Sequence, residues 1–116
     1  SFASEKYFEL ANFLKNNKNY IKSIALYEKS IELKNDKKNS DWNYYYNLAI
    51  SQERAGDWDN AEKNFYKALK ISPKQAEVLN YLAYSWLEKK INLDQAKEML
   101  IEAVSISKGQ GYILDS

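Results

Sequence analysis

The sequence predicts an all-α protein, an α-solenoid built from antiparallel helix pairs. Apolar residues recur three and four positions apart through most of the chain, as they do on one face of a helix. One proline and three glycines in 116 residues leave few places where a helix must break. A pattern of small and large residues also occurs three times along the chain, which indicates a repeated helical unit.

The first helix of each unit carries the pattern large-x-x-Leu-Ala. Residues three and four apart lie on the same side of a helix, so this pattern makes an apolar stripe. The stripe predicts helices near 4–16, 41–55 and 74–89. The pattern is found at Tyr7, Leu10 and Ala11, at Tyr45, Leu48 and Ala49, and at Leu79, Leu82 and Ala83.

The second helix of each unit alternates small residues with a large one, and it is predicted near 20–34, 58–71 and 93–107. Small side chains let two helix backbones approach closely where the helices cross. The small, large and small positions are Ser23, Tyr27 and Ser30, then Ala61, Phe65 and Ala68, then Ala96, Leu100 and Ala103.

The joints between these helices carry capping residues. Asp57 is expected to cap the helix that follows it, and Asn92 the last helix. Ser72 is expected as the cap of the helix near 74–89, with Pro73 at its first position and Gln75 three residues after the cap. "KNDKKNS", which begins at Lys34, reads as a lengthened, solvated loop rather than a binding patch, because its lysines stand beside acids.

Composition argues against an enzyme. The chain has no cysteine and no histidine, which removes cysteine nucleophiles, Ser-His triads and the usual zinc sites. Asp57 and Asp59 stand at a helix start, where capping and the helix dipole explain them. A net charge of +1 argues against nucleic acid or an anionic membrane as a partner, and no apolar run is long enough for a transmembrane helix. We therefore expect no catalysis, no metal and no cofactor.

The three units resemble tetratricopeptide repeats, whose pattern is Trp-x2-Leu-Gly-x2-Tyr, then Ala-x3-Phe, then Pro. The resemblance implies a single domain over 1–116 that forms a right-handed superhelix, with repeats at about 4–37, 42–75 and 76–110. It also implies the start of a fourth repeat at 111–116, and a longer bacterial array of which this chain is a fragment. The compartment stays open between cytoplasm and periplasm. The middle repeat matches this pattern best, at Tyr45, Leu48, Ala49, Gly56, Trp58, Ala61, Phe65, Ala68 and Pro73.

In this family the first helices line a concave groove that binds a peptide or helix of a partner protein. The resemblance therefore implies a scaffold or adaptor with a protein or peptide partner. By the family register, the predicted binding residues are Phe8, Asn12, Asn43, Tyr46, Asn47, Ile50, Asn80, Tyr81 and Tyr84, with Glu5, Glu9, Lys15, Arg54, Glu77 and Glu88 at neighbouring groove positions.

Asn12 and Asn47 match the two asparagines with which some family members grip a C-terminal carboxylate. The cationic positions of that clamp do not match, because Phe8, Glu77 and Tyr81 occupy them, so a neutral and partly apolar segment is expected instead. Whether the groove tyrosines bind a ligand or only pack stays open. The alternative function is a structural module that associates with itself through the ends of the solenoid, near Val104, Ile113 and Leu114.

Overall fold

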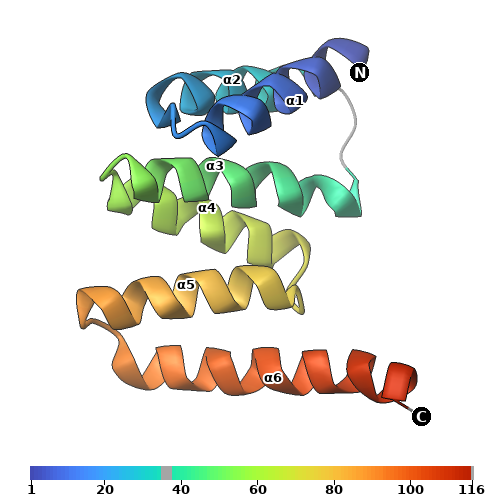
Figure 1. Ribbon diagram of the computed structural model, residues 1–116, viewed down its shortest axis with the longest axis vertical. Coiled ribbons are helices and arrows are strands. Elements are labelled where there is room, and N and C mark those ends of the chain that lie inside the picture. The colour runs from blue at the N-terminus through green and yellow to red at the C-terminus, as the bar shows by residue number, and fades with distance from the viewer. Residues whose placement is uncertain (35–37, 116) are drawn as a thin grey trace. The chain divides into compact units, whose positions relative to one another are not determined.

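The computed structural model describes residues 1–34 and 38–115, which form six α-helices and one short 3-10 helix (Figure 1). The chain divides into two compact units, Ser1–Ile71 and Ser72–Ser116. The predicted all-α class is confirmed. The elements are α1 (Phe2–Asn16), α2 (Tyr20–Glu32), η1 (Asn39–Asp41), α3 (Trp42–Arg54), α4 (Trp58–Ile71), α5 (Ala76–Lys89) and α6 (Leu93–Asp115).

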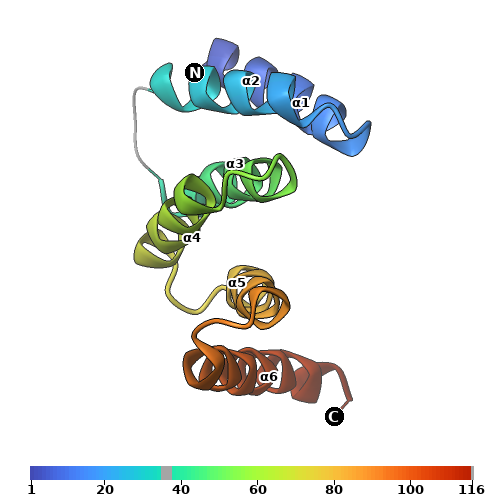
Figure 2. The same cartoon turned by 90° about the vertical axis from the view of Figure 1, so that its left-hand side faces the viewer.

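The first unit holds two antiparallel helix pairs, α1 with α2 and α3 with α4, and α2 also packs on α3 (Figure 2). The small residues predicted at the crossings are fully buried, as are Tyr27 and Phe65, the large residues between them. Leu48 of α3 joins Ala11 and Tyr27 in one apolar cluster, so repeat two covers the outer side of repeat one. This packing follows from the repeated pattern, because neither helix pair buries its face alone.

Serine replaces alanine at the crossing of α1 and α2. The Ser4 hydroxyl donates to the Ser30 carbonyl and the Ser30 hydroxyl donates to the Ser4 carbonyl, each at 2.7 Å. Ser23 donates to the Ser51 hydroxyl of α3 at 2.9 Å. Each buried hydroxyl thus has a partner, which limits the cost of burying it.

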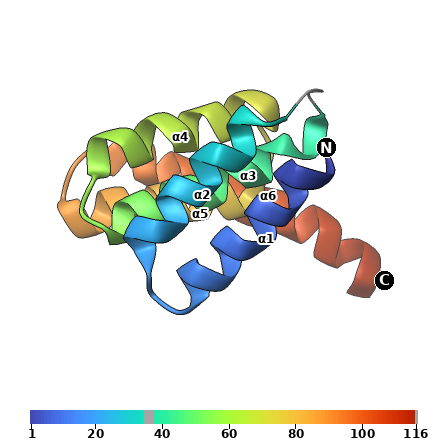
Figure 3. The ribbon, with the colours of Figure 1, turned by 90° about the horizontal axis from the view of Figure 1, so that it is seen from above.

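The second unit is one antiparallel hairpin of α5 and α6. Its core consists of apolar and small side chains that are at most 3% exposed: Val78, Leu79, Leu82, Ala83, Trp86, Ala96 and Ala103. α6 is much longer than α5 and extends past the start of its partner (Figures 1 and 3).

All three first helices end in the same turn. A residue in the left-handed region, at φ +65°, +90° or +59°, follows each helix, and the next N–H reaches back to a carbonyl five residues earlier. The left-handed residues are Lys18, Gly56 and Lys90, and the returning bonds run from Asn19 to Leu14, from Asp57 to Gln52 and from Ile91 to Trp86, at 2.8, 2.8 and 3.0 Å. The third turn is one residue longer than the other two, and its additional residue, Asn92, is also at positive φ.

Two predicted helix limits are wrong. Ser72 does not cap α5, because Ser72 to Gln75 forms a turn whose ends are joined by a hydrogen bond from Gln75 N–H to the Ser72 carbonyl at 3.3 Å. Pro73 therefore occupies the second position of a turn, which its fixed φ also suits, and the helix begins at Ala76.

The last helix was expected to end near residue 107, but α6 continues to Asp115. Gly109 and Gly111 lower helix propensity without excluding helical dihedrals, and no proline stands there. A fourth repeat at 111–116 stays a prediction, because the side chains of 110–116 lie outside the described residues.

Within the described ranges, no helix is long and apolar enough to cross a membrane. The same ranges contain no group of three or more His, Cys, Asp or Glu side chains placed to hold a metal ion.

Candidate functional site

A hydrogen-bonded chain of side chains links the first helices of repeats one and two. Lys15 Nζ of α1 donates to Asn47 Oδ1 of α3 at 2.5 Å. Asn47 Nδ2 in turn donates to the side-chain and backbone oxygens of Asn43, both at 2.8 Å. Asn47 is 8% exposed, so these bonds hold it in one orientation. Two predicted binding residues, Asn43 and Asn47, therefore lie together.

Burial lowers the pKa of the Lys15 ammonium below its ordinary value of 10.5, because the charged form loses water. A lysine ammonium has three donors and the Asn43 amide has two, whereas the bonds just described use one donor of Lys15 and none of the Asn43 amide. This part of the site therefore favours a ligand that supplies hydrogen-bond acceptors.

Asn12 has a packing role. The Tyr27 hydroxyl donates to Asn12 Oδ1, which ties α1 to α2. Burial raises the pKa of the Tyr27 hydroxyl well above its ordinary range, so it stays protonated and remains a donor. The side-chain oxygen of Asn12 is thus engaged within the protein.

Two aromatic members of the predicted set pack inside the first unit. The ring centroid of Phe8 lies 4.2 Å from that of Tyr44 and 5.7 Å from that of Tyr27. Tyr46 lies 5.6 Å from Trp42 and 6.3 Å from Phe65. Both side chains are half-buried. Phe8 therefore packs against both α2 and α3, across the interface between repeats one and two, whereas Tyr46 packs within repeat two.

The remaining predicted residues are more accessible or belong to the second unit. Ile50 of α3 is half-buried, as are Asn80 and Tyr81 of α5. Tyr84 of α5 is 57% exposed, the most exposed side chain of the predicted set. The answer to whether the groove tyrosines pack or are available for binding therefore differs between residues. Tyr46 packs against neighbouring rings, whereas Tyr84 leaves most of its surface exposed to solvent.

Sequence reasoning missed several polar residues at the helix interfaces. Asn64 donates to Gln52 Oε1 at 2.7 Å, and both side chains are buried. Asp41, 5% exposed, accepts the Lys38 backbone N–H at 2.8 Å. The position of Asn64 one residue before the buried Phe65 was the available signal, whereas nothing in the local sequence of Asp41 indicates burial.

The expectation of a solvated loop is wrong for Lys34. Its side chain is 14% exposed, lies 3.0 Å from Asp41 and stands over the Tyr44 ring at 4.3 Å. The two ends of the loop are held by Asp41, which contacts both Lys34 and the backbone of Lys38. Lys37 lies outside the described residues.

Comparison with solved structures shows the fold. The chain is similar to MamA, with a TM-score of 0.81 and 17% identity over 95% of this chain and 61% of the other, so it spans less than two thirds of that protein. It is also similar to SycD, a type III secretion chaperone of Yersinia enterocolitica solved with a peptide of the translocator YopD. That TM-score is 0.78, with 18% identity over 91% of this chain and 77% of SycD.

A third similar structure is a MamA RS-1 ArsTM double mutant, with a TM-score of 0.56 and 14% identity over 92% of this chain and 76% of that one. Comparison with curated protein sequences found no match. The family model for the tetratricopeptide repeat matches residues 3–74, more than half of the chain. This match agrees with the three helix pairs, the buried small residues and the recurring turn, and the chain belongs to the tetratricopeptide-repeat family.

Proposed function

We propose that this chain is a non-catalytic protein-interaction module that binds a neutral, partly apolar segment of a partner protein through the first helices of its repeats. Family membership supports an interaction role, and SycD, which shares the fold, was solved with a peptide of another protein. The partner itself has to be identified by experiment, because a shared fold does not carry a shared ligand.

The observation that carries the proposal is the chain of hydrogen bonds from Lys15 through Asn47 to Asn43. Its donors suit the backbone carbonyl oxygens of an extended segment, which supply acceptors at regular intervals. The polar residues are held in place before binding, which lowers the entropy lost when a ligand docks.

Within the second unit, taken by itself, Tyr84 is our candidate for an apolar contact with a partner segment. A tyrosine ring offers a large flat surface at a small cost in conformational entropy. Because Tyr84 is 57% exposed in the free protein, a ligand that covers its ring removes apolar surface from water and stabilises the complex. Phe8 and Tyr46 contribute by fixing the helices rather than by contact with a ligand, since their rings pack within the first unit.

The test is a peptide-display selection against the wild-type protein, followed by affinity measurements on two variants. Lys15→Met combined with Tyr84→Ala removes the ammonium and the exposed ring, while the methionine keeps the apolar stem. Tyr66→Ala is the matched control, because Tyr66 is 47% exposed but lies on α4, a second helix. Circular dichroism confirms that helicity is unchanged.

Selected peptides should bind the Lys15→Met, Tyr84→Ala protein at least about tenfold more weakly than wild type, as expected when a central contact is lost. The Tyr66→Ala protein should bind like wild type. Peptides that retain their affinity for the first variant, or lose it equally with the control, would move the binding site away from the first helices.

A second candidate function is head-to-tail self-association, and the second unit provides the observation that favours it. Leu87 of α5 and four residues of α6 line a surface hollow whose surface is almost entirely apolar; the α6 residues are Lys97, Leu100, Ile101 and Val104. Ile101 is 60% exposed and Val104 55% exposed.

The repeat pattern indicates what such a surface accepts. When the repeats are aligned, Leu100 and Val104 correspond to Tyr27 and Ile31. In the first unit, Tyr27 and Ile31 pack in an apolar cluster to which α3 contributes Leu48. Leu10 is the counterpart of Leu48 on α1 and is 48% exposed. We propose that α1 of a second copy occupies the hollow as α3 covers repeat one.

Sedimentation equilibrium over a range of concentrations tests this candidate. Association should weaken when Val104→Glu or Leu10→Glu places a charge in the contact. A mixture of the two variants should recover a one-to-one dimer and nothing larger, because the intact α1 of the Val104→Glu protein can dock on the intact hollow of the Leu10→Glu protein while their other ends stay altered. A monomer at every concentration would exclude self-association as the function.

A further inference from the structure

The first unit contains a basic cavity whose described lining includes none of the first-helix residues Lys15, Asn43 and Asn47 of the proposed function. Its volume is about 500 Å³, and it lies between the C-terminal ends of α2 and α4, beside η1 and α3. The polar side chains that line it are Lys34, Lys38, Asp41, Tyr45, Lys67 and Lys70, and two isoleucines complete the wall.

The cavity concentrates positive charge. Among the described lining residues, four lysines and one aspartate give a formal charge of +3, although the whole chain carries only +1. The rest of the chain is therefore net negative. The helix dipole favours lysines at the C-terminal ends of α2 and α4. That effect acts within the last turn of each helix, so it does not explain why lysines from two helix ends line the same cavity.

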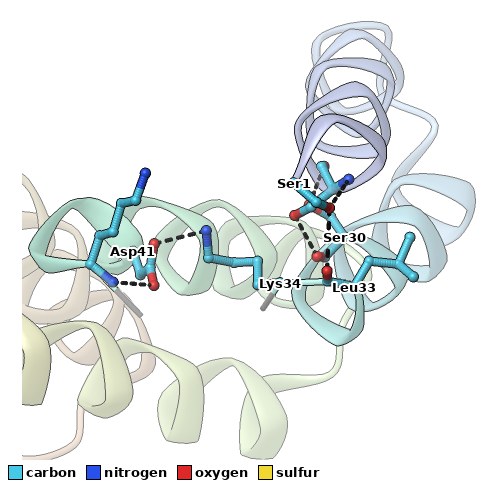
Figure 4. Close-up of polar contacts among 7 residues, drawn as sticks. Ser1, Ser30, Leu33, Lys34 and Asp41 are labelled. Carbon is cyan, nitrogen blue, oxygen red and sulfur yellow. Dashed lines mark hydrogen bonds and ion pairs between the residues drawn. The ribbon is translucent and has the colours of Figure 1, made fainter. Parts of the chain in front are cut away.

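The carboxylate of Asp41 is already engaged. Asp41 Oδ1 lies 3.0 Å from Lys34 Nζ, and Asp41 Oδ2 accepts the Lys38 N–H at 2.8 Å. Figure 4 shows Lys34 reaching across to Asp41. The pair is inside the protein, with side chains 14% and 7% exposed. The short separation between Lys34 Nζ and Asp41 Oδ1 makes this contact a close ion pair.

The outer lysines are placed to meet a ligand. Lys67 and Lys70 are exposed and stand at i and i+3 on α4, so both side chains leave the same face of the helix. Lys67 Nζ lies 5.7 Å from the Tyr45 ring centroid, which places a cation and an aromatic face at one side of the cavity. Within the described lining, Asp41 is the one carboxylate for all these cations.

We propose that this cavity binds a short acidic segment of a partner protein, with Lys67 and Lys70 contacting its carboxylates and the tyrosine and isoleucine wall holding an apolar side chain. A long polyanion such as nucleic acid fits less well, because its affinity depends on many phosphate contacts and the protein outside the cavity is net negative. A carboxylate at lysine ammonium groups forms charge-assisted hydrogen bonds.

The probe is a short synthetic peptide with acidic residues on both sides of one isoleucine, labelled with fluorescein and followed by anisotropy. The same peptide with Asn and Gln in place of the acids is the ligand control. We expect the acidic peptide to bind, the neutral peptide not to bind, and binding to weaken as salt rises, since these lysines are exposed to solvent.

Lys67→Met with Lys70→Met should weaken binding by about tenfold or more. Lys22→Met with Lys63→Met is the matched control, because it removes the same charge from exposed positions of the same unit that do not line the cavity. That control should weaken binding less than about twofold. Circular dichroism should verify that the wild type and both double variants are folded.

Several results would overturn the proposal. Equal losses in the two double variants would indicate attraction to overall charge rather than to the cavity. Inorganic phosphate that competes as strongly as the peptide would make the cavity a small-anion site, and tighter binding of a single-stranded oligonucleotide with the same lysine dependence would make it a nucleic-acid site. The Lys15→Met, Tyr84→Ala protein should bind the acidic peptide normally, so failure of the first-helix proposal leaves this one testable.

Discussion

The left-handed residue after each first helix gives a prediction whose sign differs between repeats. An L-residue in this region costs about 1 to 2 kcal/mol because its Cβ crowds the following carbonyl oxygen. Glycine avoids this cost, but fixing its freer backbone costs about 0.5 to 1 kcal/mol more than for alanine. Lys18 and Lys90 are therefore in an unfavourable conformation at φ +65° and +59°, whereas Gly56 is well suited to φ +90°.

Lys18→Gly and Lys90→Gly should each stabilise the protein by about 0.5 to 1 kcal/mol, the difference between these two costs. Gly56→Ala should destabilise it by about 1 kcal/mol or more, from backbone conformation alone. No atom outside the neighbouring residues lies within 4 Å of a Cβ built at Gly56, so a steric clash does not contribute.

Urea unfolding followed by circular dichroism measures these changes as shifts in midpoint at constant slope. Lys22→Gly is the control, because Lys22 is an exposed lysine inside α2, and glycine there should destabilise by about 1 kcal/mol. If glycine at 18 and 90 destabilised the protein as it does at 22, the turn would not hold these lysines in the left-handed region and the reasoning would be refuted.

Three further predictions concern the first unit. Burial raises the pKa of Tyr27 above its ordinary 10.0, so the unfolded state ionises first as the pH rises. The contribution of Tyr27 to the free energy of unfolding should therefore be fully present below about pH 10 and should fall above it by up to about 1.4 kcal/mol per pH unit. Urea unfolding at alkaline pH should show a smaller loss of stability in Tyr27→Phe than in the wild type. Phe65→Ala should cost about 3 to 5 kcal/mol, because the ring is fully buried, and a thermal melt that is unchanged would contradict the core described above. Asp41→Ala should cost about 1 to 3 kcal/mol by leaving Lys34 without its carboxylate, as urea midpoints can verify, and Asp41→Asn should recover part of the loss through the hydrogen bond from Lys38.

The helix pairs could be predicted because their packing depends on residue size at a fixed spacing. Ala61 and Ala68 have to be small for α3 and α4 to approach, and Phe65 has to be large to fill the space between them. This requirement is visible in the sequence because it recurs in each repeat, even where serine replaces alanine at positions 23 and 30.

Helix ends were less predictable because the same residues suit more than one local structure. Ser72 and Pro73 are as compatible with a turn before α5 as with its first turn, and only the packing of the hairpin decides between them. At Gly109 the cost of continuing α6 is about 1 kcal/mol relative to alanine, which the rest of a long helix can offset.

The candidate site was predicted only in part. The family register places Asn43 and Asn47 on one helix, but the contact with Lys15 joins residues 32 positions apart and depends on how α1 meets α3. The ion pair of Lys34 with Asp41 was missed for a related reason. A lysine and an aspartate in a polar stretch of sequence predict solvated side chains. Lys34 and Asp41 are buried only because of how the folded chain packs around them.

The two-helix construction of the second unit has a consequence for how the protein opens. Ser72–Ser116 has one hairpin with which to bury its apolar side chains, and Leu87, Ile101 and Val104 remain partly in water. A unit of this size has little core to set against its conformational entropy, whereas the first unit buries side chains from four helices. Amide protons of α5 and α6 should therefore exchange with deuterium sooner than those of α3 and α4, and a protease should find its first cleavage sites there. Loss of the protein under stress would then begin at the last hairpin while the lysine cavity is still intact.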